Sequence, residues 1–559
     1  MNRFVNKYII RVAFLILLFA SPLVLTNYDD TRNFEMSKNL DIFYSLFNEL
    51  NTYYVDPIDP GELMSLTIEK MLESLDPYTK YIPESDVERF QMMTKGEYGG
   101  IGAVIGLRDS AMMIFEVFEG FPAHKSGLLP GDKVVQVDGH TIIGKNPEEI
   151  HELLQGQPGT VLKIGIQRTP SKEIKNFAVQ RQKIEMKSVP YYGIIDNNIG
   201  YIKLTSFTQN CASEVKNACI ELKNKGAQSL ILDLRDNPGG LLMEAIQLTN
   251  IFVEKDKKIV FTRGKNISSE SSFLTREAPL DTKIPLAVLV NENSASAAEI
   301  VSGALQDLDR AVVIGNQTFG KGLVQTRREL THNSLLKITT SKYYIPSGRC
   351  IQKIDYSLKE FQGKGKAKPD SLHQIFYTLN KRPVKDGGGI IPDIYVTADS
   401  LGNLLPELIK NYVIIDFVNQ NFDYADSLRY HPKKFKVTDE LYSKFITYTE
   451  QKNFNLLSPG EKLIEQLINQ SKKEHLQIDN EISLLQKQIN IQQKKLFIQE
   501  KKEIIKQLEL EIIKRLYFER GQIAYKVVED ENITEAKKYL QNSNLYSGIL
   551  QGKIGVHKK

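Results

Sequence analysis

PLAVLVNENSASAAEIVSGAL (285–305) determines the fold class, because an apolar strand passes almost directly into a helix. PLAVLV (285–290) predicts the strand, and NENSASAAEIVSGAL (291–305) predicts an amphipathic helix whose first turn carries mainly Ser and Ala. So little side-chain volume at a helix start has two explanations. One is close packing, and the other is a substrate that approaches the backbone there, with one serine as the nucleophile.

Strands and helices alternate on both sides of this stretch. GYIKLTSF (200–207), SLILDLRDN (229–237) and AVVIG (311–315) are predicted strands, and a predicted helix follows each of the first two. This alternation is typical of an α/β core. LVQTRREL and SLLKITTSKYY, which flank the turn THNS, then predict a β-hairpin.

The chain divides into five regions by composition and pattern. They are a targeting segment (1–27), a helical region (35–95), a β domain with one or two helices (96–183), the α/β core (190–396) and a helical C-terminal extension (400–559). The length of 559 residues agrees with three or four domains. Within the core, the polar and glycine-rich stretch 358–395 predicts exposed loops.

Composition excludes several classes of protein. Hydrophobic residues make up 41% and charged residues 25%, as in ordinary globular proteins. A net charge of +4 is small for this length and predicts neither nucleic acid nor an acidic surface as a partner. Cys211, Cys219 and Cys350 are too few for a disulfide framework, and no Cys/His cluster predicts a metal or an organic cofactor.

The N-terminus has a targeting pattern. Arg3, Lys7 and Arg11 precede the uncharged apolar run VAFLILLFASPLVLT (12–26). Positive charge before such a run is typical of a signal peptide or a membrane anchor, and the length of the run leaves both open. We therefore expect the rest of the chain to work on the periplasmic side of the cell envelope, either secreted or anchored in the inner membrane.

The C-terminal extension contains a candidate coiled coil over 474–517. Its apolar stripe follows a 4-3-4-7 spacing and consists of Ile478, Ile482, Leu485, Ile489 and Leu496. Dimerisation and packing of a helical hairpin within one chain explain the stripe equally well. Docking of an adaptor and a cover over an active site are further roles that the spacing leaves open.

Two serines and one lysine carry the candidate chemistry. Ser294 and Ser296 open the predicted helix, and Lys321 follows in the glycine turn TFGKGLVQ (318–325). A serine nucleophile needs a base that removes its proton. The histidines are poor candidates, because His332 falls in the hairpin turn and the others lie in the β domain or far downstream. Packing serines and a solvated lysine are the alternatives when each motif is taken alone.

Lys321 acts as a base only when it is neutral. A free lysine has a pKa of about 10.4, and a base near neutral pH needs about 7–8. Burial away from acids lowers the pKa of an amine. Phe319, Leu323 and Val324 are apolar neighbours in the sequence, and no carboxylate occurs from 310 to 328. Gln325 is placed to hold the amine without restoring its charge.

The turn DNPGG (236–240) predicts an oxyanion hole. It joins the end of a strand to the start of a helix, where backbone N–H groups point outward. Gly239 and Gly240 permit close approach of a substrate, and the N–H of Ala297 is a second candidate donor. Phosphate binding is the competing interpretation, but the GxxxxGK[ST] pattern is missing.

SASAAE, TFGKGLVQ and LDLRDNPGG, preceded by YGGIG and LLPGDKVVQVDG, closely resemble motifs of the bacterial carboxyl-terminal processing (tail-specific) serine proteases, which contain a PDZ domain. The resemblance covers residues 38–396. It implies an N-terminal helical region, a PDZ domain and a protease core with a crotonase-like, ClpP-like α/β fold.

The resemblance also implies roles for single residues. By position, Ser296 is the nucleophile, Lys321 the general base and Gln325 the residue that orients the lysine. Asp307 matches a family carboxylate that supports the active-site region. Relatives often have SASASE, so Ala298 replaces the third serine, which matters little because the nucleophile is the middle one.

The backbone donors follow from the same motifs. The N–H groups of Gly240 and Ala297 are expected to form the oxyanion hole, with Gly239 beside them. In YGGIG (98–102), the candidate peptide-binding residues are Gly99, Gly100, Ile101 and Gly102. Their N–H groups would capture the terminal carboxylate of a substrate, whose tail adds as a strand.

The leading interpretation is a serine endopeptidase with a Ser/Lys dyad that recognises C-terminal tails and needs no cofactor. A catalytically inactive PDZ scaffold of the envelope is the second hypothesis, although Ser296, Lys321 and Gln325 are all present. Hydrolysis of small thioesters explains the α/β core but leaves the peptide-binding domain unexplained. Natural substrates, oligomeric state and gating by the PDZ domain are not readable from the sequence.

Overall fold

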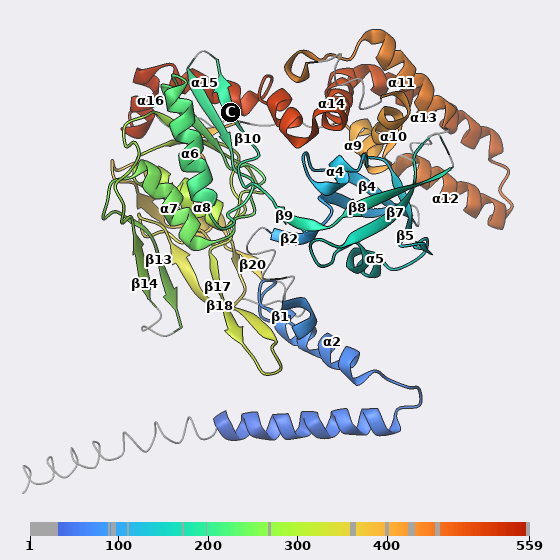
Figure 1. The fold of residues 1–559 in the computed structure, drawn as a ribbon, viewed down its shortest axis with the longest axis horizontal. Helices are drawn as coiled ribbons and strands as arrows, with labels where there is room; N and C mark the ends of the chain where they lie inside the picture. The colour runs from blue at the N-terminus through green and yellow to red at the C-terminus, as the bar shows by residue number, and fades with distance from the viewer. Residues whose placement is uncertain are drawn as a thin grey trace, which may run out of the picture. The chain divides into compact units, whose positions relative to one another are not determined.

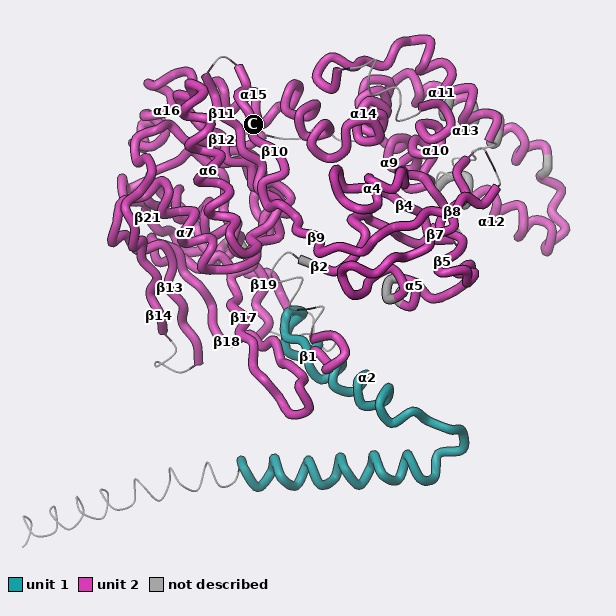
Figure 2. The backbone as a smooth tube through the Cα atoms, in the orientation of Figure 1, with its two compact units in different colours: residues 1–81 teal, residues 82–559 magenta. Residues whose placement is uncertain are grey.

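The computed structural model describes residues 32–87, 90, 97–108, 111–169, 171, 173–196, 198–265, 270–357, 365–396, 402–422, 431–452 and 459–554. It divides into two compact units, Met1–Tyr81 and Ile82–Lys559, which Figure 2 draws in different colours. The predicted targeting segment, 1–27, lies outside the described residues.

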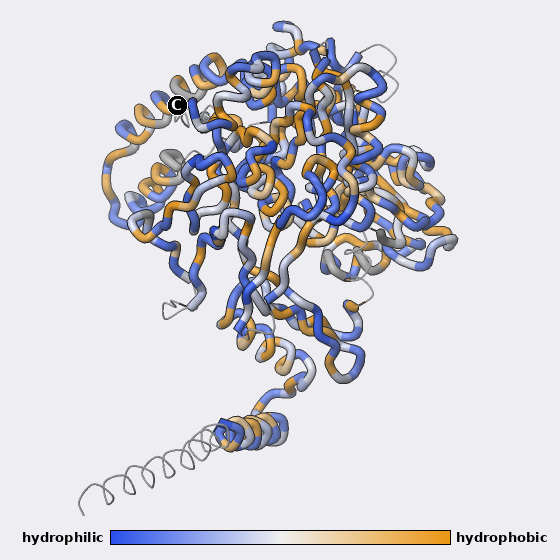
Figure 3. The backbone as a smooth tube through the Cα atoms, turned by 90° about the vertical axis from the view of Figure 1, so that its left-hand side faces the viewer, coloured by the Kyte–Doolittle hydropathy of each residue, from blue (hydrophilic) through white to orange (hydrophobic). Residues whose placement is uncertain are grey.

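The described part of the first unit is helical. Residues 32–53 form one helix, and α2 spans Pro60–Glu73. Asp59 caps α2, because its carboxylate accepts hydrogen bonds from the first N–H groups of the helix. Among the described residues no helix is long and apolar enough to cross a membrane. Hydrophilic residues interrupt the hydrophobic ones along the described helices in Figure 3.

The β domain, residues 97–185 of the second unit, is built around an antiparallel sheet of order β3-β4-β5-β7-β8, with β6 beside β5. Its strands are β3 (Ala103–Arg108), β4 (Ala111–Val117), β5 (Lys133–Val137), β6 (His140–Thr141), β7 (Val161–Gln167) and β8 (Ile174–Gln180). Two helices, α4 (Pro122–Lys125) and α5 (Pro147–Leu154), complete the domain. The core is apolar, and β3 lies at the edge of the sheet.

The α/β core contains a six-stranded sheet of order β10-β11-β12-β15-β16-β23. The strands are β10 (Tyr191–Ile195), β11 (Ile199–Lys203), β12 (Ser229–Asp233), β15 (Leu286–Val290), β16 (Val312–Gly315) and β23 (Ile394–Tyr395). All neighbours from β11 to β23 are parallel, and only β10 pairs antiparallel. Every residue of β12 and β15 is buried, which explains their continuous apolar sequences.

Helices cover both faces of this sheet (Figure 1). The first face is covered by α6 (Cys211–Asn224), α7 (Leu242–Phe252) and α8 (Ala297–Asp307). The second face is covered by α15 (Glu531–Leu540) and α16 (Ser543–Leu550), far along the chain. Successive side chains of a strand point to opposite faces. The last helices of the described chain are therefore part of the core.

Two neighbouring residues of β12 show that helices cover both faces of the sheet. Leu232 belongs to the cluster under α6, α7 and α8, whereas Ile231 packs with Ile533 and Ala536 of α15. Tyr546 of α16 adds a polar contact, because its hydroxyl lies 2.9 Å from the backbone nitrogen of Leu286 in β15. The C-terminal extension thus contributes both apolar and polar contacts to the sheet.

A second, antiparallel sheet extends from the core. It contains β13 (Lys258–Gly264), β14 (Ser271–Leu274), β17 (Leu323–Glu329) and β18 (Leu335–Tyr344). β17 and β18 form the hairpin that the sequence predicts, which is confirmed. β18 also pairs with β13, so the hairpin is fixed to the core.

The prediction of exposed loops over 358–395 is wrong for its last part. The short strands β21 (Ile375–Tyr377) and β22 (Pro383–Lys385) pair with each other, and residues 387–390 are buried. A Cβ on Gly389 would lie 2.7 Å from the carbonyl oxygen of Thr318. The glycines are therefore required for close packing against the Lys321 loop, not for exposure.

The remaining C-terminal helices form a separate apolar cluster. The cluster is formed by α9 (Leu404–Lys410), α10 (Val413–Asn421), α11 (Asp439–Gln451) and α14 (Lys501–Lys526). The end of α13 (Asp479–Gln499) packs against it, and α12 (Pro459–Glu474) contacts α13. A continuous coiled-coil helix over 474–517 is not formed, because helices end at Glu474 and Gln499 within it. Contacts of α13 with α12 and α14 agree instead with the alternative of helices that pack within one chain. At the junction of α13 and α14, the buried carboxylate of Glu500 accepts hydrogen bonds from the N–H groups of Leu404 and Leu405.

We expect the Ala536→Asp variant to lose at least about 3 kcal/mol of unfolding free energy, because it places an unpaired carboxylate against the buried sheet. Urea denaturation measures the loss. Thr534→Asp is the matched control, since it puts the same carboxylate on the exposed side of α15. We expect the control to change stability by only about 0.5 kcal/mol. Equal losses in both variants would contradict the packing of α15 on the sheet.

Candidate active site

Three loops follow the carboxyl ends of neighbouring parallel strands. DNPGG (236–240) comes shortly after β12, NENSAS (291–296) directly after β15, and the Lys321 loop (316–322) directly after β16. Parallel strands place their carboxyl ends at one edge of the sheet, where α/β proteins bind ligands. The topology therefore brings the candidate nucleophile, oxyanion turn and base together.

The two candidate serines differ in their surroundings. Ser294 is wholly buried, and its hydroxyl donates a hydrogen bond to the carbonyl oxygen of Leu234 at 2.8 Å. The same hydroxyl accepts the N–H of Asn291 at 3.0 Å. Ser296 is only half-buried. Ser294 is therefore a structural residue, and Ser296 is the serine that a substrate can reach.

Ser296 has a strained backbone at the start of α8. Its φ of 56° and ψ of −113° are unusual for a residue with a side chain. Strain of this kind persists only where the surroundings fix it, and it is concentrated at functional sites. The N–H of Ala297, the first helical residue, has no partner within its own helix. Ser296 therefore presents its hydroxyl beside an N–H donor.

The DNPGG turn lies directly against the nucleophile. A Cβ on Gly239 would lie 2.8 Å from Cβ of Ser296 and 2.9 Å from the backbone nitrogen of Ala297. Phe207 fixes the turn, because its N–H donates to Gly239 and its carbonyl oxygen accepts the N–H of Leu241. In such a bridge, the N–H of the intervening residue Gly240 points away from Phe207.

Gly239 is not available as an oxyanion donor, which corrects one sequence-based assignment. Its N–H donates to the side-chain oxygen of Asn237 at 2.9 Å. Gly240 and Ala297 remain the candidate oxyanion donors, because the N–H of Ala297 directly follows Ser296 and that of Gly240 points away from Phe207. Gly239 is required for steric reasons, because any side chain there would collide with Ser296.

Lys321 is half-buried in a loop that contacts the nucleophile loop. The N–H of Phe319 donates to the carbonyl oxygen of Ser294 at 3.0 Å. Gly320 has a φ of +87°, and a Cβ there would lie 2.5 Å from Cβ of Lys353. Of the apolar neighbours expected from the sequence, Leu323 is buried and Phe319 is 49% exposed.

Glu299 contacts the backbone of both candidate catalytic residues, and the sequence analysis did not single it out. Its carboxylate is wholly buried and accepts hydrogen bonds from the N–H groups of Ser296 at 2.8 Å and Lys321 at 2.9 Å. Burial raises its pKa to about 7, although the hydroxyl of Thr318 and three backbone N–H groups oppose the rise. The S-x-x-E spacing of a capping box was the available signal.

Gln325 and Asp307, two further predicted site residues, form hydrogen bonds with residues outside the Ser296 and Lys321 loops. The amide nitrogen of Gln325 lies 3.3 Å from the hydroxyl oxygen of Thr339 on β18. Asp307 is the last residue of α8, about 16 Å along the helix axis from its start. Its carboxylate accepts hydrogen bonds from Arg349 at 2.8 Å and from the N–H of Ser347 at 2.9 Å. Asp307 therefore anchors the far end of the helix and does not reach the reacting atoms.

The strand before the oxyanion turn is held by a buried ion-pair network. Asp233 accepts hydrogen bonds from Tyr201 at 2.7 Å and from Arg235 at 2.6 Å. Arg235 also donates to Asp530, which caps α15, at 2.8 Å. Although burial opposes ionisation, Lys203 and Arg235 hold the pKa of Asp233 well below its usual range. The C-terminal helices are thereby tied to the oxyanion strand.

The predicted peptide-binding residues lie at the end of one strand of the β domain and in the short connection to the next strand. Gly99 and Gly100 belong to β2 (Glu97–Gly100), which pairs antiparallel with β9 (Gln182–Glu185). Ile101 is buried, and Gly102 has a φ of +76° immediately before the edge strand β3. A Cβ on Gly102 would lie 2.4 Å from Cβ of Phe121, so only glycine fits there.

Three segments of the chain match known families. Residues 198–358 match peptidase family S41, 116–168 match the PDZ domain, and 404–540 match the C-terminal helical domain of probable PDZ-proteases. A probable CtpA-like serine protease of Staphylococcus haemolyticus is 33% identical over 438 residues, which are 76% of this chain and 84% of the relative.

The chain belongs to the S41 family of carboxy-terminal processing proteases. A carboxy-terminal-processing protease of Bartonella bacilliformis is 36% identical over 344 residues, 61% of this chain and 79% of the relative. The Bacillus subtilis carboxy-terminal processing protease CtpA is 36% identical over 308 residues, 55% of this chain and 65% of the relative. This protease is thus a serine peptidase with a PDZ domain and a C-terminal helical domain.

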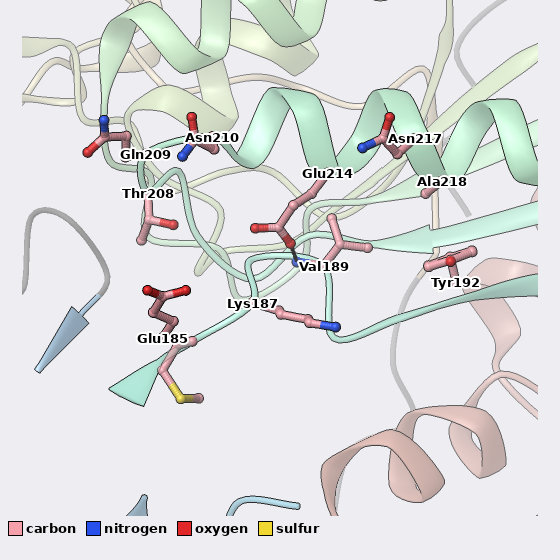
Figure 4. A pocket seen from close by; sticks show the side chains of 11 residues that line it. Glu185, Lys187, Val189, Tyr192, Thr208, Gln209, Asn210, Glu214, Asn217 and Ala218 are labelled. Atoms are coloured by element: carbon pink, nitrogen blue, oxygen red, sulfur yellow. Dashed lines mark hydrogen bonds between the residues drawn. The ribbon is translucent and has the colours of Figure 1, made fainter. Parts of the chain in front are cut away.

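A cavity of about 420 Å³ lies beside the linker from the PDZ domain to the protease core (Figure 4). Its lining includes Lys187 of the linker, Tyr192 of β10, and Thr208 and Asn210, which follow Phe207, the residue that fixes the DNPGG turn. Glu214 fixes the linker, because its carboxylate accepts the N–H of Val189 at 3.0 Å (Figure 4). In the sequence, the residues that line the cavity therefore lie between the PDZ domain and the oxyanion turn.

We expect Ser296→Ala to lower the turnover of a protein substrate by about 10⁴-fold or more while the protein stays folded. Ser294→Ala is the matched control, since the two side chains differ in position and not in chemistry. It removes a buried hydrogen bond and is expected to lower stability by about 1–3 kcal/mol, with activity retained below the unfolding temperature. Loss of activity in Ser294→Ala alone would reverse the assignment.

Glu299 is expected to make stability depend on pH. Its folded pKa of about 7 lies above its ordinary value of 4.5, so the folded protein keeps a proton that the unfolded chain releases. The free energy of unfolding therefore falls as pH rises from 4.5 to 7, by on the order of 3 kcal/mol. Urea denaturation at pH 5 and pH 8 is expected to show this fall in the wild type and not in Glu299→Gln. The same fall in both proteins would assign it to another group.

Proposed function

We propose that this protein is an endopeptidase of the cell envelope that binds C-terminal tails through its PDZ domain and cleaves polypeptides with a Ser296–Lys321 dyad. The observation that carries the proposal is the meeting of three loops at one edge of the sheet. Ser296 is half-buried at a helix start, the glycine turn lies against it, and Glu299 joins its backbone to that of Lys321. The helix-covered parallel sheet supports a crotonase-like, ClpP-like class for the core.

In the proposed reaction, neutral Lys321 accepts the hydroxyl proton of Ser296 while the oxygen attacks the carbonyl carbon of the scissile peptide bond. The carbonyl oxygen becomes negative and is stabilised by the N–H groups of Gly240 and Ala297. The protonated lysine then gives its proton to the leaving amine. Water hydrolyses the acyl-enzyme by the same route. Gln325 remains the proposed residue for orienting the lysine, beside Thr339.

The edge strand of the PDZ domain supports recognition of tails. β3 presents Val104, 44% exposed, and Leu107, 50% exposed, beside the Gly100–Gly102 loop. An extended tail would add along β3, with its terminal carboxylate at the loop. From there, the cavity beside the linker is our proposed route for the substrate toward the oxyanion turn.

The proposal of an envelope location depends on the sequence of residues 1–27. Three basic residues precede an uncharged apolar run, as in signal peptides and membrane anchors. A protease that works there would meet unfolded or exported chains with accessible tails.

The test is cleavage of an unstructured reporter with an apolar C-terminal tail, supplied with either a free carboxylate or a carboxamide terminus. We expect the carboxylate form to be cleaved with a KM at least about 10-fold lower, because the PDZ loop binds the charge. Lys321→Ala is expected to reduce kcat by about 10³-fold or more, with circular dichroism confirming its fold.

The outcomes separate the candidate functions. Equal cleavage of both reporter forms would contradict tail recognition but leave the dyad intact. Equal cleavage by wild type and Lys321→Ala would contradict the dyad. Binding of the free-carboxylate reporter without cleavage would favour the inactive scaffold.

A further inference from the structure

The proposed nucleophile and base come from different elements. Ser296 begins α8, whereas Lys321 belongs to the loop before β17. A displacement of about 1 Å between reacting groups can cost 10²-fold in rate. Contacts that fix the backbone of both residues at once are therefore of special interest. Two buried side chains make such contacts.

Glu299 binds the N–H groups of both residues. One carboxylate oxygen, Oε2, accepts from Ser296 at 2.8 Å and from Lys321 at 2.9 Å. The other, Oε1, accepts from the hydroxyl of Thr318 at 2.6 Å and from the N–H of Gly320 at 2.8 Å. The carboxylate thus holds the Lys321 loop to the first turn of α8.

Tyr343 binds the carbonyl oxygens of the same two residues. Its side chain projects from β18 and is 2% exposed. The hydroxyl oxygen lies 3.1 Å from the carbonyl oxygen of Ser296 and is also hydrogen-bonded to that of Lys321. A tyrosine hydroxyl has one proton to donate, so the two carbonyl oxygens share it in a three-centre hydrogen bond.

We infer that Glu299 and Tyr343 are the positioning residues of the dyad: together they bind both the N–H and the C=O of Ser296 and of Lys321. This inference rests on the proposed function for its effect on catalysis. Neither side chain is assigned to the reacting atoms. Their effect is to keep the serine and lysine backbones in one fixed arrangement, so that the side chains start from a defined geometry.

The sheet provides a close control for Tyr343. Tyr344 is the next residue of β18, points to the opposite face and stacks on Phe261 with ring centroids 5.2 Å apart. Tyr343→Phe and Tyr344→Phe each remove one hydroxyl and leave the ring. Any difference between them reports the two carbonyl contacts of Tyr343.

We expect Tyr343→Phe to lower kcat by about 10–100-fold with KM changed less than about 3-fold, while Tyr344→Phe keeps the wild-type values. The acid limb of the pH profile of kcat/KM is expected to shift in Tyr343→Phe, because the amine of Lys321 is displaced. Glu299→Gln is expected to lose more, since its amide nitrogen accepts no hydrogen bond and leaves the donors to one carboxylate oxygen without an acceptor. A residue that only stabilised the fold would lower the unfolding temperature without moving the pH profile.

Hydrogen exchange of the backbone tests the inference independently of activity. In both Tyr343→Phe and Glu299→Gln, peptides covering 318–322 are expected to exchange at least about 10-fold faster than in wild type, and those covering α6 at the wild-type rate. Unchanged exchange in the loop, or a wild-type kcat and pH profile in Tyr343→Phe, would overturn the inference. If the two variants exchange faster but the wild-type protein cleaves no substrate, the result would count against the proposed function alone.

Discussion

β12 and β15 bury every side chain, so the sheet that contains them has to be covered on both faces. Helices α6, α7 and α8 cover one face, and α15 and α16 cover the other. The parallel arrangement then brings the ends of β12, β15 and β16 to one edge. The geometry of the active site is thus a consequence of how the sheet is buried, since the same strands that make the core deliver the three loops.

Two buried carboxylates show how the protein controls charge near this edge. Asp233 has cationic partners in Lys203 and Arg235, which overcome its burial and keep it ionised. Glu299 has N–H groups and a hydroxyl as its partners in the Lys321 loop and the helix start, and burial prevails. Lys203 ends β11, and Arg235 lies between β12 and the DNPGG turn. The partners of Glu299 in the Lys321 loop are neutral groups, so no cation offsets the effect of burial on its pKa.

Local pattern was sufficient to predict the alternation of the core, the β17–β18 hairpin and the meeting of the serine, glycine and lysine motifs. These features depend on short-range periodicity and on turn residues. The sequence did not distinguish Ser294 from Ser296 without the resemblance, because the difference arises from the contact of Ser294 with Leu234. The role of Tyr343 was equally hidden, since nothing in its own strand indicates that Ser296 and Lys321 lie beneath it.

The error at 387–390 and the choice that 474–517 left open have a common physical cause. Residues 387–390 look like an exposed glycine loop, but they are buried because the Lys321 loop packs on them from a distant part of the chain. The stripe at 474–517 allowed one long coiled-coil helix or helices packed within the chain, and the structure has the second, since α13 ends at Gln499 and contacts α14. Tertiary contacts outweighed local propensity at both places.

The cover supplied by α15 and α16 also bears on how the chain is made. The last strand of the sheet, β23, ends at Tyr395, and α16 ends at Leu550. At a synthesis rate of 5–20 residues per second, roughly 8–30 s pass between the two. During this interval the nascent sheet has one apolar face without its native cover. Chaperones are expected to bind such a chain. A product of interrupted translation that lacks the last helices would expose apolar core residues and would be prone to aggregation and proteolysis.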